Sequence, residues 1–307
     1  SKLICVNAIP VSNFNLNQNI GCAPFSVTLD NITNNPNCGM NTYSWSVSYL
    51  STTGCLPNTS NFSFIGGTNA SSINPQIQFT NPGVYTIGLI ATSPGGCIST
   101  STTKTVTVKS KPTVSTITAT NQICQNGTIT PSVTVGNCNA TNAATYAWSF
   151  PSGSPATSSS ANPGTITYST AGTFTISLDV TNECGTTTVT KQVVVNETPN
   201  AIVPANKIIC NGFPSGAFTF SSAVVGASFN WTNNTTSIGL SANGSGNISS
   251  FNGSNSTASP ITATITVTPS LGTCAGTPQA FTITVNPTPA LPSVTSTVTY
   301  CQNATAN

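Results

Sequence analysis

One structural unit recurs about every 90 residues along this chain, and this repeat limits what the chain can fold into. Three segments with the alternating pattern of a β-strand end at Val108, Val195 and Val285, and prolines follow each of them within a few residues. We therefore expect three modules, at residues 10–110, 111–198 and 199–287. Residues 1–9 are expected to end a preceding segment, and residues 288–307 to begin a fourth module.

Each module is predicted to be all-β. Trp45, Trp148 and Trp231 each follow an aromatic residue two positions earlier, and side chains two apart point to the same face of a strand. The segments 84–91, 174–180 and 261–267 alternate apolar and polar residues, with Tyr85 and Phe174 on the apolar faces of the first two. About seven short strands around a tryptophan are typical of an immunoglobulin-like sandwich, so these five aromatic residues are expected in the cores.

Eleven cysteines with one methionine indicate an oxidising compartment, where disulfides persist. Zinc is excluded because histidine and Cys-x-x-Cys pairs are absent from the sequence. Cys97, Cys184 and Cys274 each lie 11 residues before the last valine of a module, and Cys22, Cys124 and Cys210 lie 11 or 12 residues after a linker proline. This regular placement predicts bridges from the first strand of each module to the turn before its last strand.

The predicted disulfides are Cys22–Cys97, Cys124–Cys184 and Cys210–Cys274, with Cys38–Cys55 as a second bridge in the first module. Cys138 competes with Cys124 for Cys184, so that pairing stays open. Cys5 and Cys301 are expected to pair with cysteines outside this sequence. Such bridges would staple each module internally.

Charged residues make up 3% of the chain: six lysines, four acidic residues, and no arginine or histidine. The net charge of +2 is too small for a nucleic-acid partner, and the sequence contains no apolar run of the roughly 18 residues that a membrane helix needs. Catalysis by acid–base or nucleophilic groups needs titratable side chains close together, so no enzyme is expected. Asp179 and Glu183 are expected to be solvated turn and edge residues, and a calcium site built on them with asparagine and backbone oxygens is the weaker alternative.

The asparagine- and glycine-rich run 231–259 is the best candidate for direct contact with a surface. Amides can hydrogen-bond sugars and hydrated surfaces without strong salt dependence. The candidate contact residues are Asn233, Asn234, Asn243, Asn247, Asn252 and Asn255. The competing interpretation is a long polar connection that covers the sandwich.

Several short patterns resemble the PKD and PKD-like modules of surface proteins in gliding Bacteroidetes. They are Gly21-Cys22-Ala23-Pro24-Phe25, Asn81-Pro82-Gly83-Val84-Tyr85 and Thr170-Ala171-Gly172-Thr173-Phe174. The junctions Val285-Asn286-Pro287-Thr288-Pro289 and Tyr300-Cys301-Gln302-Asn303 resemble those of SprB-type gliding-motility adhesins. One departure is that the Asp-Phe-Gly-Asp-Gly run typical of PKD modules after the tryptophan is missing here.

The resemblance implies tandem disulfide-stapled PKD-like sandwiches, arranged end to end in a giant protein that the type IX secretion system exports to the outer cell surface. This stretch would then be a non-catalytic stalk and a multivalent adhesive surface. Its partners would be surface polysaccharide, the substratum or other cell-surface proteins, with the secretion and gliding machinery engaged through other regions. Two alternatives stay open: the spacer array of a secreted hydrolase, and a subunit of an extracellular filament.

Overall fold

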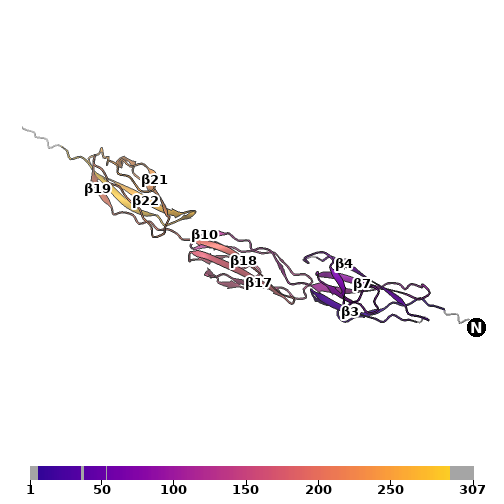
Figure 1. The fold of residues 1–307 in the computed structure, drawn as a ribbon. Coiled ribbons are helices and arrows are strands. Elements are labelled where there is room, and N and C mark those ends of the chain that lie inside the picture. The colour runs from indigo at the N-terminus through magenta and orange to yellow at the C-terminus, as the bar shows by residue number, and fades with distance from the viewer. Residues whose placement is uncertain (1–5, 36–37, 53, 291–307) are drawn as a thin grey trace, which may run out of the picture. The chain divides into compact units, whose positions relative to one another are not determined.

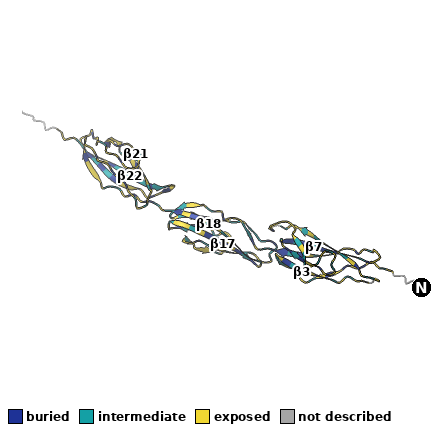
Figure 2. Cartoon of the chain, viewed as in Figure 1, coloured by how far each residue is buried: buried dark blue, intermediate teal, exposed yellow. Residues whose placement is uncertain are grey.

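The computed structural model describes residues 6–35, 38–52 and 54–290 (Figure 1). Strands are its main regular elements, and the helical element of these ranges is one 3-10 turn, η1 (Thr236–Ile238). The chain divides into two compact units, residues 1–195 and 196–307. Unit 1 contains two hydrophobic cores and unit 2 contains a third. Figure 2 shows buried stretches, in dark blue, along the strands of both units. We call the strands around these cores the first, second and third sandwich. The predicted all-β immunoglobulin-like fold is confirmed.

The first sandwich consists of two four-stranded sheets, with strand orders β1-β3-β6-β5 and β2-β8-β7-β4. Its strands are β1 (Phe14–Leu16), β2 (Ile20–Cys22), β3 (Phe25–Asn31), β4 (Thr42–Leu50), β5 (Phe62–Ile65), β6 (Gln76–Phe79), β7 (Gly83–Thr92) and β8 (Thr102–Lys109). Between the sheets Trp45 packs edge-on against Phe14, with ring centroids 5.0 Å apart, and Tyr85 is fully buried. Strand β2 runs parallel to β8 with Cys22 opposite Lys109, so the beginning of the sandwich lies beside its end.

The second sandwich packs a five-stranded sheet, β10-β18-β17-β13-β15, against the three-stranded sheet β11-β16-β14, beside the short pair β12-β9. Its strands are β9 (Thr113–Val114), β10 (Gln122–Cys124), β11 (Gly127–Ile129), β12 (Val135–Gly136), β13 (Thr145–Ser149), β14 (Gly153–Ser154), β15 (Thr157–Ser158), β16 (Ile166–Tyr168), β17 (Gly172–Asn182) and β18 (Gly185–Asn196). Trp148 is buried and stacks on Phe150 at 5.6 Å, while the half-buried Phe174 stacks on Tyr168 at 5.3 Å. Strands β17 and β18 pair until Asn182 meets Gly185, which leaves a tight turn of two residues.

The third sandwich has one sheet of order β19-β24-β22-β20-β21, with β23 paired to β22. Its strands are β19 (Lys207–Cys210), β20 (Ser228–Asn233), β21 (Asn243–Ser245), β22 (Ile261–Leu271), β23 (Cys274–Ala275) and β24 (Gln279–Asn286). The facing layer is held by isolated bridges such as Phe218 with Ile248, and the buried Trp231 lies in the core between the layers. Strand β19 runs parallel to β24, as β2 does to β8.

Candidate functional site: a cross-linked joint between two sandwiches

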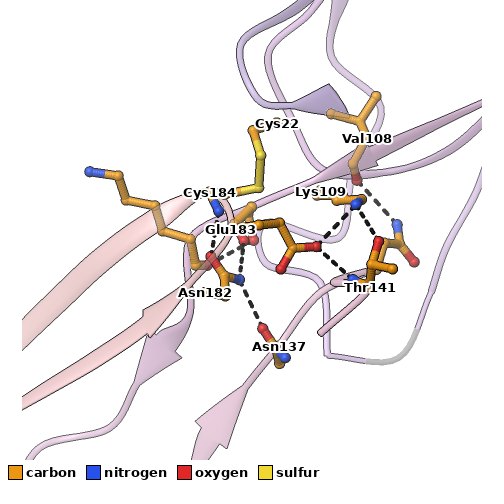
Figure 3. Close-up of a disulfide and its surroundings, with 11 residues drawn as sticks. Cys22, Val108, Lys109, Asn137, Thr141, Asn182, Glu183 and Cys184 are labelled. Atoms are coloured by element: carbon orange, nitrogen blue, oxygen red, sulfur yellow. Dashed lines mark hydrogen bonds and ion pairs between the residues drawn. A yellow bond between two sulfur atoms is a disulfide. The ribbon is translucent and has the colours of Figure 1, made fainter. Parts of the chain in front are cut away.

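Two disulfides connect the first sandwich to the second within unit 1. Cys22, at the end of β2, bonds Cys184 in the turn between β17 and β18, with Cα atoms 5.5 Å apart (Figure 3). Cys55, between β4 and β5, bonds Cys138, between β12 and β13, with Cα atoms 4.5 Å apart. Both members of the second bridge are buried. We call these two bridges, with the linker residues 108–112, the joint.

The predicted bridges Cys22–Cys97 and Cys124–Cys184 are therefore wrong. Cys22 lies beside the end of β8, whereas Cys97 precedes the beginning of that strand. Strand β8 has 8 residues, and at roughly 3.3 Å per residue this places the two cysteines about 25 Å apart. A disulfide needs Cα atoms within about 7 Å. The same argument applies to Cys124 and Cys184. The Val194 amide, near the end of the 12-residue β18, donates a hydrogen bond to Asn121 O, so Cys124 lies near that end, whereas Cys184 immediately precedes the beginning of β18.

The other two predicted bridges are also wrong. Cys38 and Cys55 lie beyond opposite ends of the nine-residue β4, and Cys55 bonds Cys138. Cys210 is a free thiol opposite Asn286, at the other end of β24 from Cys274. Cys38, Cys124 and Cys274 are disulfide-bonded, and Cys97 is a free thiol. Cys5 and Cys301 lie outside the described residues.

Side chains of the second sandwich hold the linker between the bridges. Three alternate linker carbonyls each accept one hydrogen bond from that sandwich. The bonds are Asn139 Nδ2 to Val108 O (3.1 Å), Asn182 Nδ2 to Ser110 O (2.8 Å) and Thr187 Oγ1 to Pro112 O (2.6 Å). The side-chain oxygen of the buried Asn182 also accepts the amide hydrogen of Cys184 at 2.8 Å, so one residue holds both the linker and the turn that carries the disulfide. A linker held at every second carbonyl has little freedom to bend.

An ion pair between Lys109 and Glu183 also connects the linker to the second sandwich (Figure 3). Lys109 Nζ lies 3.0 Å from Glu183 Oε1, and the two side chains are only 10% and 23% exposed. The Thr141 amide donates to the same Glu183 oxygen at 2.6 Å, and Lys109 also donates to the Thr141 hydroxyl. The hydrogen bond from the Thr141 amide, followed by the Glu183 backbone amide and Lys109, lowers the pKa of Glu183 from 4.5 to about 2. Glu183 is thus not the solvated turn residue that its sequence position predicts.

We expect the joint to weaken as the pH falls from about 4.5 to about 2. A carboxylate whose pKa is lower in the folded state stabilises that state above its unfolded pKa, and this stabilisation is lost as the pH falls through the folded pKa. Glu183→Gln removes the effect at every pH. The free energies of unfolding of wild type and variant should therefore differ at pH 7 and converge near pH 2.

Denaturant titration followed by tryptophan fluorescence measures both free energies. Asp179→Asn removes a carboxylate from the same hairpin, where it accepts a hydrogen bond from the Thr188 hydroxyl, and serves as the matched control. If Glu183→Gln and Asp179→Asn show the same dependence on pH, Glu183 has no special role in the joint.

A groove of about 420 Å³ adjoins the bridge between Cys55 and Cys138. It is lined by Gly54, Leu56, Thr113, Val114, Ser115, Thr134, Val135 and Gly136. None of these lining side chains is an ordinary acid or base, so the groove offers shape and apolar contact but no general acid or base.

The asparagine-rich run 231–259 divides into structural and exposed residues. Asn233 and Asn255 are 6% and 3% exposed, and their amides donate to the carbonyls of Leu240 and Val285. These two residues therefore fix the loop and are not the surface contacts that the run predicts, because a buried amide must satisfy its hydrogen bonds within the protein. The exposed members of the set are Asn234, Asn243, Asn247 and Asn252.

The calcium alternative finds no support in the geometry. The Glu183 carboxylate already lies against the Lys109 ammonium, which would repel a cation, and Asp179 accepts from Thr188. Across residues 6–35, 38–52 and 54–290, histidine, cysteine and acidic side chains form no group of three or more that could hold a metal ion. Within the same ranges no helix has the length and apolar character to cross a membrane.

Residues 109–196, which comprise the second sandwich and its linker, match the family described as PKD domain. No curated protein matches the chain. Similar solved structures include the N-terminal eight Ig domains of Down Syndrome Cell Adhesion Molecule (12% identity, TM-score 0.45, covering 92% of this chain and 37% of that one). Others are Drosophila N-cadherin EC1-4 (13%, 0.35, 92% and 76%) and the PKD1 domain of Vibrio anguillarum Epp (26%, 0.23, 34% and 96%). The chain thus spans much less than two thirds of the first of these structures.

The fold and the joint define a class of protein: a repeat of immunoglobulin- and PKD-like sandwiches, typical of extracellular adhesion or spacer regions. Disulfides in the cross-linked joint agree with an extracellular protein. Within this class, the second sandwich is the part of the chain that matches the PKD domain family, over residues 109–196.

Proposed function

We propose that this chain is a non-catalytic segment of a large extracellular adhesin, in which the sandwiches form a stiff stalk and present many weak contact sites. The cross-linked joint carries the proposal. A spacer that transmits force needs connections that neither bend nor separate, and here two disulfides, an ion pair and three hydrogen bonds to linker carbonyls hold one connection.

The parallel pairing of two strands in the first and third sandwiches supports the same role. In the first sandwich β2 and β8 are parallel, and in the third sandwich β19 and β24 are parallel. Tension on the two ends of a sandwich pulls such strands in opposite directions along their length. All hydrogen bonds of the pair are then loaded together, which resists separation better than loading them one at a time.

The adhesive half of the proposal follows from the surface. With four acidic and six basic residues in 307, exposed contacts are made by amides and hydroxyls, and each such contact is weak. The partners would be polysaccharide, the substratum or other cell-surface proteins. The resemblance of the repeat patterns to those of Bacteroidetes gliding-motility adhesins supports the further proposal that the chain acts on the outer surface of a gliding cell, after export by the type IX secretion system.

The proposed adhesive function can be tested by comparing the attachment of many linked copies with that of one copy. Beads that carry many copies of the chain should adhere to polysaccharide-coated glass roughly 10²–10⁴ times more strongly than a single copy binds, because linked contacts act at high effective concentration. Adhesion should change little between low and high salt, since the surface has few charges.

The exposed amides supply matched variants. Asn243→Ala with Asn252→Ala should reduce bead adhesion, whereas Gln192→Ala, an exposed amide on β18 of the second sandwich, serves as the control. Tight binding by a single copy, or adhesion abolished by salt, would contradict the multivalent amide mechanism. The stalk role would then depend on the stretching measurements alone.

A further inference from the structure

The Cys22–Cys184 bridge of the joint uses one cysteine position on each sandwich, and the position of Cys22 recurs in the third sandwich. Cys22 ends an edge strand parallel to the last strand of its sandwich, opposite Lys109, and the next amide, that of Ala23, donates to Lys109 O at 2.9 Å. Cys210 ends β19 opposite Asn286, and the Asn211 amide donates to Asn286 O at 2.9 Å. Cys210 thus has the same backbone setting as Cys22, but it is an exposed free thiol.

The second position recurs in the first sandwich. Cys184 lies in the turn before the last strand of its sandwich, with its amide donating to the Asn182 side chain at 2.8 Å. Cys97 lies in the corresponding turn between β7 and β8, with its amide donating to the Ser93 hydroxyl at 3.1 Å. Cys97 is a free, partly exposed thiol.

Two large apolar side chains are exposed at this end of the first sandwich, where the Cys97 thiol also donates to Asn7 O at 3.8 Å. Ile98 is 62% exposed, and Met40 is 72% exposed in the loop whose Gly39 lies against Pro94 of the Cys97 turn. In the second sandwich the equivalent loop and turn carry Cys138 and Cys184, which bond the first sandwich. The same end of the first sandwich therefore presents the elements that form a joint, without a sandwich against them in the described residues.

We propose that Cys97 and Cys210 are the two halves of a further joint of the Cys22–Cys184 kind. Cys210 bonds the turn cysteine of a following sandwich of this construction, and Cys97 bonds the edge-strand cysteine of a preceding one. A second copy of this chain carries both partners, so Cys210 of one copy can bond Cys97 of another. The two thiols lose two electrons and two protons to a disulfide oxidant such as oxidised glutathione, which is released as two thiols. This inference depends on the joint alone and holds whether or not the chain is adhesive.

Two single variants separate specific from random bonding. Cys97→Ser keeps Cys210, and Cys210→Ser keeps Cys97; both also carry Cys301→Ser, since that residue lies outside the described part of the chain. In oxidised glutathione, a one-to-one mixture should give roughly tenfold more disulfide-linked dimer than either variant alone, because docking raises the effective concentration of the matched thiols. Mass spectrometry of the digested dimer should show a peptide pair containing Cys97 and Cys210.

A further variant tests the docking surface itself. Met40→Asp with Ile98→Asp, added to Cys210→Ser, should slow dimer formation while Cys97 still reacts with a small thiol reagent at its original rate. Equal dimer yields in the mixture and in the separate variants would overturn the proposal, as would capture of both thiols by glutathione alone.

Discussion

Unit 1, stretched between handles on Asn19 and Gln192, should release only about 40 Å of chain when both sandwiches unfold with their disulfides intact. Both attachment residues are exposed and lie just outside the Cys22–Cys184 bridge. This bridge spans a sequence separation of 162 residues, so nearly the whole of the two sandwiches is shielded from extension. The bridge Cys55–Cys138, with a separation of 83, lies inside that loop.

Removing the bridges in turn should give two distinct longer lengths. Cys22→Ser with Cys184→Ser leaves the inner bridge, and Cys38 and Cys124 stay disulfide-bonded, so the newly freed chain is at most 162 less 83, or 79 residues, about 270 Å. Full reduction frees all 162 residues, about 560 Å. Optical-tweezers or atomic-force measurements resolve these lengths.

Cys97→Ser is the matched control for this experiment, because it removes a thiol that forms no bridge, and its released length should equal that of wild type. If wild type under oxidising conditions releases several hundred ångströms, the two sandwiches are not enclosed by the Cys22–Cys184 bridge and the stalk loses its covalent limit.

The cysteine pattern shows which structural information a sequence repeat contains. Equal spacings identify Cys97, Cys184 and Cys274 as one kind of position and Cys22, Cys124 and Cys210 as another, and the structure places Cys97 and Cys184 in matching turns. The partners are nevertheless wrong, because spacing alone does not say at which end of a sandwich each position lies. The 11 residues between Cys184 and Val195 are almost the length of β18, and that length separates the two positions within one sandwich.

The hydrogen bonds and the ion pair of the joint are harder to predict from the sequence than the cysteine positions. Asn182 and Asn139 resemble the many other asparagines of this chain, and their roles depend on how two sandwiches pack together. Glu183 differs, because it is one of four acidic residues and is adjacent to a cysteine, and Lys109 is one of six lysines and ends a last strand. In a chain with so few charged residues, the positions of Glu183 and Lys109 suggest that each takes part in an ion pair. Their separation in the sequence, however, gives no sign that they pair with each other.

Core truncation should show which sandwiches unfold together. Trp148 is 2% exposed and stacks on Phe150, so Trp148→Ala is expected to lower the free energy of unfolding by about 3–5 kcal/mol. For a unit of this size that corresponds to a fall in melting temperature of roughly 10 °C. The joint connects the two sandwiches through the linker and two disulfides. The first sandwich should therefore become less stable when the second unfolds.

Calorimetry of the oxidised chain should therefore show Trp45→Ala and Trp148→Ala lowering the same transition, that of unit 1, while Trp231→Ala lowers the transition of unit 2. Val225→Ala, at a side chain that is 94% exposed, should shift neither transition and serves as the control. Separate transitions for Trp45→Ala and Trp148→Ala would mean that the sandwiches unfold independently. The bridges and linker bonds would then limit how far the chain extends without adding to the resistance of either sandwich, because coupling in stability requires that one sandwich lose free energy when its neighbour unfolds.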